Sequence, residues 1–74
     1  MKLINDEHFR KIFARRLRQI LYARDMSQSE LAKKSGISQT CISRYANGSR
    51  MPSGYCITKL AEALGCRVED LTRE

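Results

Sequence analysis

The sequence predicts an all-α fold of five helices, and three observations support this prediction. Apolar residues recur every three or four positions in each segment, which is the period of a helix with one buried face. No alternating run of β-branched residues indicates a strand. Serine and glycine residues stand where helices would begin or end, and they divide the 74 residues into short helical segments. We therefore expect one domain over residues 1–74, with a small core.

The first helix is predicted over about residues 6–24. Asn5 can cap it, and the acidic Asp6 and Glu7 suit the positive end of a helix dipole. Ile4 can pack on Phe9 as a hydrophobic staple. One broad face collects the apolar residues expected in the core: Phe9, Ile12, Phe13, Leu17, Ile20 and Leu21. The opposite face carries Lys11, Arg15, Arg18, Gln19 and Tyr22.

The second helix begins at a capping box. In this pattern the Ser27 hydroxyl accepts from the amide of Glu30, and the Glu30 carboxylate accepts from the amide of Ser27. Leu31 and Ala32 then point inward. Gly36 ends the helix, because the sharp turn favours a residue with positive φ.

The third helix is predicted at residues 39–46, between a cap at Ser38 and an ending at Asn47-Gly48. Only about three residues separate it from the second helix, so the two must cross steeply. A close crossing needs a small residue at the contact, and Ala32 is expected there. Residues 28–46 therefore form a helix-turn-helix.

Two further helices complete the predicted fold. Ser53 caps the fourth and Gly65 ends it. Its apolar stripe consists of Ile57, Leu60, Ala61 and Leu64. Val68 and Leu71 allow a short fifth helix.

Composition and charge limit the classes of partner and the location that we expect for this protein. The net charge is +6, and between Arg10 and Arg50 ten basic residues face only Asp25 and Glu30, a local excess of +8. Such a segment suits nucleic acid or an anionic membrane surface, although a solvated charged face would look the same. No apolar run approaches a membrane span and the N-terminus lacks a signal peptide, so we expect a cytoplasmic protein.

The cysteines and the single histidine do not form a metal-binding pattern. Cys41, Cys56 and Cys66 are widely spaced, and His8 is the only histidine. We expect reduced, mostly packed thiols, with no metal and no cofactor. Cys41 could be a redox sensor, but its angular position places it on the inner edge of the third helix.

The third helix divides into a polar and an apolar side. At about 100° per residue, its hydrogen-bonding residues occupy one arc: Gln39, Thr40, Ser43, Arg44 and Asn47. Glutamine can pair with adenine, arginine with guanine, and a threonine methyl can touch a thymine methyl. Gln28, at the start of the second helix, lies beside free backbone N–H groups and suits a phosphate. Any amphipathic helix needs a polar side, so this arc could simply face solvent. Glutamate and lysine are the usual residues of such a side, however, and their absence here favours contact with DNA.

The segment 27–45 resembles the phage-repressor and Cro-like helix-turn-helix family. The signature positions hold Ala32, Gly36 and Ile42. The resemblance extends through Asn47-Gly48-Ser49-Arg50-Met51-Pro52 and Leu60-Ala61-Glu62-Ala63-Leu64-Gly65, and it covers about residues 9–72. It implies a five-helix, lambda-repressor-like domain whose third helix enters the major groove of DNA.

The resemblance also implies a role for individual residues. Gln39, Thr40 and Arg44 would read bases, with Ser43 as a weaker candidate. The residues implied to contact phosphate are Gln28, Asn47, Arg50 and Arg10. The loop before Pro52 varies in length within the family, which weakens the assignment of Arg50.

This chain departs from the family at three positions. Many members have an arginine at Leu21 and a glutamate at Ala46, which form a largely buried ion pair. Loss of both partners avoids a stranded buried charge, so we predict that Leu21 and Ala46 lie close together in the core. Asp25 replaces a common helix-ending glycine, and we expect it in the left-handed conformation.

The function expected from these features is transcription regulation, as a repressor that binds a palindromic operator on double-stranded DNA as a homodimer. The dimer contacts would come from the fifth helix or the N-terminal segment, although Val68 and Leu71 could equally pack back on the fourth helix. The alternative is an antitoxin or adaptor that uses the same fold to bind a protein, which predicts an apolar third helix. The sequence contains no catalytic constellation, so we do not expect an enzyme.

Overall fold

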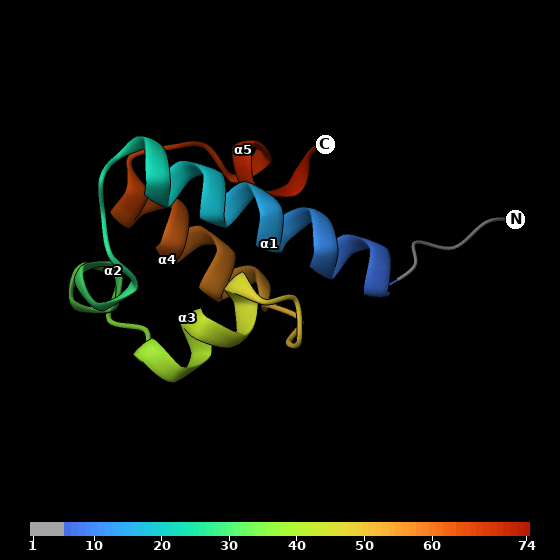
Figure 1. Ribbon diagram of the computed structural model, residues 1–74, viewed down its shortest axis with the longest axis horizontal. Coiled ribbons are helices and arrows are strands. Elements are labelled where there is room, and N and C mark those ends of the chain that lie inside the picture. Colours follow the sequence, from blue (N-terminus) through green and yellow to red (C-terminus); the bar gives the residue numbers. More distant parts are fainter. Residues whose placement is uncertain (1–5) are drawn as a thin grey trace, which may run out of the picture.

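The computed structural model describes residues 6–74, which form five α-helices and no strand (Figure 1). The all-α class and the order of the elements are as predicted. The helices are α1 (Asp6–Ala23), α2 (Gln28–Ser35), α3 (Gln39–Ala46), α4 (Gly54–Leu64) and α5 (Val68–Thr72). The cap predicted at Asn5 and the contact predicted for Ile4 fall outside the described residues.

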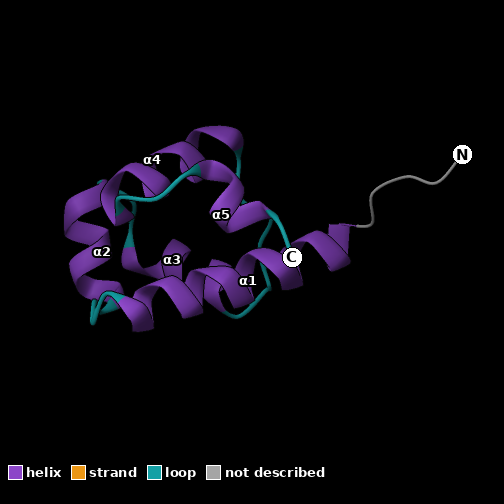
Figure 2. Ribbon diagram, turned by 90° about the horizontal axis from the view of Figure 1, so that it is seen from above, coloured by secondary structure: helices purple, strands orange, loops and turns teal. Residues whose placement is uncertain are grey.

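The five helices enclose one core. In Figure 2, α1 and α4 lie along opposite sides, with α2 at one end and α5 between them toward the other. α3 packs against both α1 and α2, and α5 packs against both α1 and α4. Every helix contributes at least one fully buried side chain to this core: Phe13 and Leu17 from α1, Leu31 from α2, Ile42 from α3, Leu60 from α4 and Leu71 from α5. No helix of residues 6–74 has the length and apolarity to cross a membrane.

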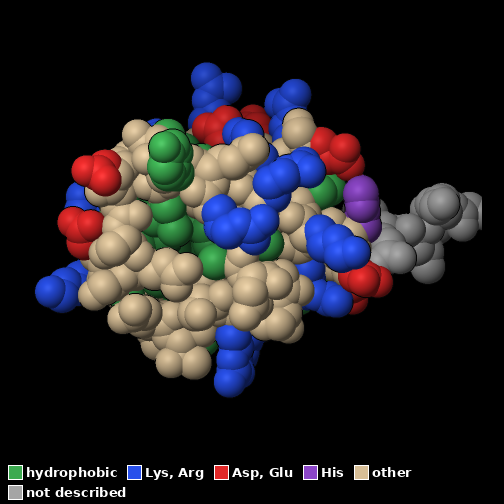
Figure 3. All heavy atoms as spheres, in the orientation of Figure 1, with side chains coloured by type: hydrophobic (Ala, Val, Ile, Leu, Met, Phe, Trp, Pro, Cys, Tyr) green, Lys and Arg blue, Asp and Glu red, His purple; other side chains and the backbone are tan. Residues whose placement is uncertain are grey.

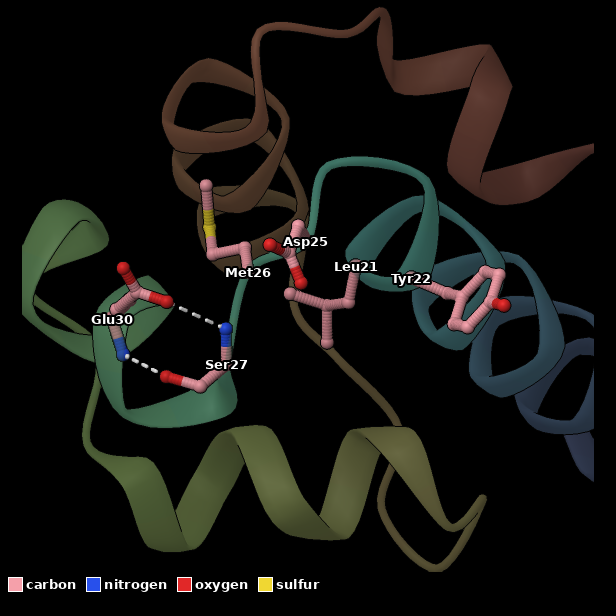
Figure 4. A pocket seen from close by; sticks show the side chains of 6 residues that line it. All are labelled: Leu21, Tyr22, Asp25, Met26, Ser27 and Glu30. Carbon is pink, nitrogen blue, oxygen red and sulfur yellow. Dashed lines mark hydrogen bonds between the residues drawn. The ribbon is translucent and has the colours of Figure 1, made fainter.

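Serine side chains fix the start of three helices. The hydroxyls of Ser27, Ser38 and Ser53 accept from backbone amides three residues ahead, at 3.0, 3.2 and 3.1 Å. At α2 the capping box is complete, since the Ser27 amide also donates to the Glu30 carboxylate at 2.9 Å (Figure 4). Hydrogen bonds from the Ser27 amide and hydroxyl lower the pKa of Glu30.

Left-handed residues end α1, α2 and α4 as predicted. Gly36 ends α2 with φ 77°, and Gly65 ends α4 with φ 69°. Asp25, which follows α1, has φ 52°, which confirms the expected left-handed conformation at that departure from the family.

The core also settles which residue of α5 faces inward. Leu71 is fully buried, whereas Val68 is 41% exposed. Of the two alternatives for these residues, packing on the rest of the domain is therefore correct for Leu71. Leu21 and Ala46 are both buried in the core, as predicted, and their direct contact stays a prediction.

Candidate nucleic-acid interface

The outer face of α3 forms an open groove. Five exposed side chains line it: Gln39, Thr40, Ser43, Arg44 and Asn47. The inner face of the same helix is apolar, with Ile42, Tyr45 and Ala46 buried and Cys41 partly buried. The predicted division of this helix is confirmed, and one groove brings together the four residues predicted to read bases.

Tyr45 anchors the inner face of α3. The rings of Tyr45 and Phe13 make a T-shaped contact, with their centroids 6.1 Å apart. Only 4% of Tyr45 is exposed. Burial, together with a hydrogen bond with Cys56, raises the pKa of Tyr45 to about 12. The phenol is thus neutral at physiological pH, and the charged group of α3 is Arg44, which lines the groove on the outer face.

The residues predicted to hold phosphate lie on three different segments. Gln28 is the first residue of α2 and is half-buried, while Arg50 is exposed in the loop after α3. Of the four, Asn47 alone lines the α3 groove. Its Oδ1 accepts from the amide of Ser49 at 2.9 Å, which leaves the Nδ2 donors for another acceptor. Arg10 lies on α1 and its Nε donates to the carbonyl of Gly48 at 3.0 Å.

Several arginines of α1, and Arg24 in the turn that follows it, bond to backbone carbonyls of other segments. Besides Arg10, Arg18 donates to Ala46, Arg16 to Asp70 at 2.7 Å, and Arg24 to Leu64. The sequence predicts a phosphate contact for Arg10 and places Arg16, Arg18 and Arg24 only in a basic segment. Their partners are far away in the chain, and no local pattern marks them. Part of the basic segment therefore holds the fold together.

Basic side chains are also prominent on the surface. Figure 3 shows Lys and Arg groups in blue over the region where α1 runs in Figure 1, and at the lower edge, where α3 lies. Lys11, Arg15 and Arg18 line a second groove, which continues to Asn47 and Gly48 at the end of α3.

The three cysteines are free thiols, each partly buried. Hydrogen bonds with Ser53 and Tyr45 lower the pKa of Cys56, whereas burial raises the pKa of Cys66. Within residues 6–74, no group of three or more potential ligands could hold a metal ion.

Two short helices joined by a tight turn, with the second presenting a polar groove to solvent, define a helix-turn-helix domain. The helix-turn-helix family model matches residues 15–71, and the chain belongs to this family, in its Cro/C1-type branch.

The solved structures that are similar to this chain include the following two. The restriction-modification controller protein C.AhdI from Aeromonas hydrophila is 35% identical, with a TM-score of 0.78 over 81% of this chain and 91% of that one. The hypothetical transcription factor NHTF from Neisseria is 26% identical, with a TM-score of 0.84 over 97% of this chain and 83% of that one. No curated protein matches the sequence significantly.

Proposed function

We propose that this protein is a sequence-specific DNA-binding transcription regulator that reads double-stranded DNA with α3 in the major groove. The observation that carries the proposal is the α3 groove. Its lining side chains are all exposed hydrogen-bonding groups, and none is a carboxylate that would repel phosphate. The similarity to a controller protein and to a transcription factor supports the same class of function.

The side chains of the groove match the chemistry of base edges. Gln39 can pair bidentately with adenine, and Arg44 with O6 and N7 of guanine. Thr40 offers a hydroxyl and a methyl group, and Ser43 a hydroxyl donor and acceptor. These four residues are our candidates for base contacts.

Phosphate contacts would hold the domain in register. The candidates are Gln28, with the free amides at the start of α2, Asn47 through its Nδ2, and the exposed Arg50. Arg10 is the weakest of the four candidates, because its Nε is already bonded to Gly48, although its terminal nitrogens could reach a phosphate.

Two copies of the chain would act together as a repressor on a palindromic operator. The recognition helix has eight residues, so a single copy reads only a few base pairs. A symmetric pair of half-sites roughly 34 Å apart multiplies that specificity.

Selection of bound duplexes from a random DNA pool tests this function. We expect a palindromic consensus, with half-sites about one helical turn apart. Recovery of a stoichiometric protein partner, with no enrichment of any DNA sequence, would reverse the proposal in favour of an antitoxin or adaptor.

Arg44→Ala tests whether Arg44 contacts a base. We expect it to relax the base preference at one position of each half-site, at a cost of roughly 1–3 kcal/mol for the selected sequence. Lys33→Ala is the matched control, since Lys33 is an exposed cation of α2 outside the α3 groove. Repeating the selection with both variants gives the preference directly. If Arg44→Ala weakens all sequences equally, Arg44 contacts phosphate instead.

A further inference from the structure

One stripe of α1 faces the C-terminal end of α3. Arg10, Ala14 and Arg18 are spaced four residues apart, so they lie along one side of the helix. The Arg10 guanidinium donates to the carbonyl of Gly48, and the Arg18 guanidinium donates to the carbonyl of Ala46. Ala14, which lies between the two arginines, is 3% exposed. Two cations of α1 thus reach the end of α3 from either side of a small residue.

The backbone at this end of α3 shows why Arg18 matters. The last four carbonyls of a helix lack partners within the helix. Here the carbonyl of Ser43 accepts from Asn47, that of Arg44 from Ser49, and that of Tyr45 from Gly48. The carbonyl of Ala46 is the fourth, and its hydrogen bond comes from Arg18. Arg18 therefore supplies the bond that the loop does not.

Charge and close packing reinforce these bonds. The C-terminal end of a helix carries a partial negative charge, so both guanidiniums are attracted to it. Gly48 has φ 78°, and a Cβ built on it would lie 3.8 Å from the Ala14 Cβ and 3.8 Å from the Arg10 carbonyl oxygen. The backbone after α3 therefore runs close to α1 where the two arginines attach.

We propose that Arg10 and Arg18 are positioning residues that clamp the end of α3 and fix the direction in which its outer face points. The proposal rests on the proposed reading of DNA by α3. The other end of α3 is held by the short turn from α2, so the clamp completes a two-point attachment. Bidentate bonds to base edges need accurate geometry, whereas attraction to phosphates tolerates small shifts. Loss of the clamp should therefore damage specific binding more than non-specific binding.

The test compares Arg18→Met with Arg24→Met. Methionine retains an apolar stem but has no donor and no charge. Arg24, which directly follows α1, is the matched control, because it makes the same kind of bond to a helix end, the carbonyl of Leu64 in α4. For each folded variant, dissociation constants are measured for the selected operator and for an unrelated duplex, over a range of salt concentrations.

For Arg18→Met we expect the ratio of specific to non-specific affinity to fall about tenfold, the order expected for loss of one charge-assisted hydrogen bond. Arg24→Met should leave this ratio unchanged even where it lowers the melting temperature. Arg18→Lys should restore part of the ratio, since an ammonium can still donate to the carbonyl. If Arg18→Met weakens both duplexes equally and lowers the salt slope by about 0.9, Arg18 contacts a phosphate and the clamp is wrong.

A measurement without DNA separates the clamp from the proposed function. In hydrogen exchange, Arg18→Met should speed exchange of the amides of Asn47, Gly48 and Ser49 about tenfold relative to Arg24→Met. Unchanged exchange at these amides would overturn the clamp, whatever the DNA experiments show. Conversely, wild-type protein that enriches no DNA sequence would refute the function, while the exchange data would still decide the clamp.

Discussion

Asp25 follows α1 in the left-handed conformation, and three helices of this protein end with a left-handed residue in the same way. After α1, the amide of Met26 bonds to the carbonyl of Leu21 and that of Asp25 to Tyr22, at 3.0 and 3.1 Å. This pair of bonds is a Schellman motif, which also ends α3 and α4, where Gly48 and Gly65 take the left-handed position. Asp25 is the one non-glycine residue of 6–74 with positive φ, so it bears a steric cost that the glycines avoid.

Asp25→Gly should therefore stabilise the domain. We expect a gain of about 0.5–1 kcal/mol, because relief of the left-handed conformation outweighs the greater freedom of glycine in the unfolded chain. In a domain of this size, 1 kcal/mol corresponds to a rise in melting temperature of roughly 4–8 °C. Thermal and urea unfolding of both proteins measure the difference.

Asp25→Asn is the control for charge. Asparagine also tolerates the left-handed conformation, but it removes the carboxylate from the turn shown in Figure 4. If Asp25→Asn stabilises as much as Asp25→Gly, the negative charge and not the backbone conformation is the cause.

Among the elements, α2 depends most clearly on a local signal. It has only eight residues, too few for a stable isolated helix, and its first turn is held by the capping box of Ser27 and Glu30. This box also fixes where the chain enters the helix-turn-helix, since Gln28 follows directly. The start of α2 is thus both a structural cap and a proposed phosphate contact.

Ser27→Ala should destabilise the protein by about 1 kcal/mol, because it leaves an amide of the first turn without its side-chain acceptor. Ser29→Ala, one residue into the same exposed turn, should change stability little or raise it slightly, since alanine favours helix. Urea midpoints with an unchanged m-value give both effects. Equal losses in the two variants would show that the hydroxyl of Ser27 has no special role.

The element scale also shows what could be predicted from sequence. Helix ends depend on residues within four positions of each other, so the caps at Ser27, Ser38 and Ser53 were readable directly. Helical periodicity predicted which residues line the α3 groove. The acceptors of Arg10, Arg18 and Arg24 were not, because they lie 38, 28 and 40 residues away and long flexible side chains find them only in the folded chain.

At the scale of the whole molecule, one set of arginines serves two purposes. Hydrogen bonds to carbonyls orient Arg10 and Arg18 but do not remove their charge. Both still contribute to the net charge of +6 and to the field that attracts a polyanion. A basic segment can therefore stabilise the fold and attract DNA at once, which is why charge alone did not distinguish the two roles.

The last helix closes the core, and its two apolar residues allow a matched test. Leu71 is fully buried on the core side of α5, whereas Val68 is 41% exposed. Leu71→Ala should cost about 2–5 kcal/mol, a large part of the stability of so small a domain, because it removes buried methyl groups and leaves a cavity. Val68→Ala should cost less than about 1 kcal/mol. Thermal unfolding measures both.

Adding DNA to the same experiment separates folding from recognition. Leu71 is buried away from the α3 groove, so Leu71→Ala should lose binding only through the unfolded fraction. A ligand that binds only the folded state stabilises it, by about 2.7 kcal/mol at one hundred times its dissociation constant. Excess operator should therefore raise the melting temperature of Leu71→Ala and of the wild type alike. A folded Leu71→Ala domain that gains no stability from operator would mean that α5 shapes the DNA-binding surface itself, beyond closing the core beneath it.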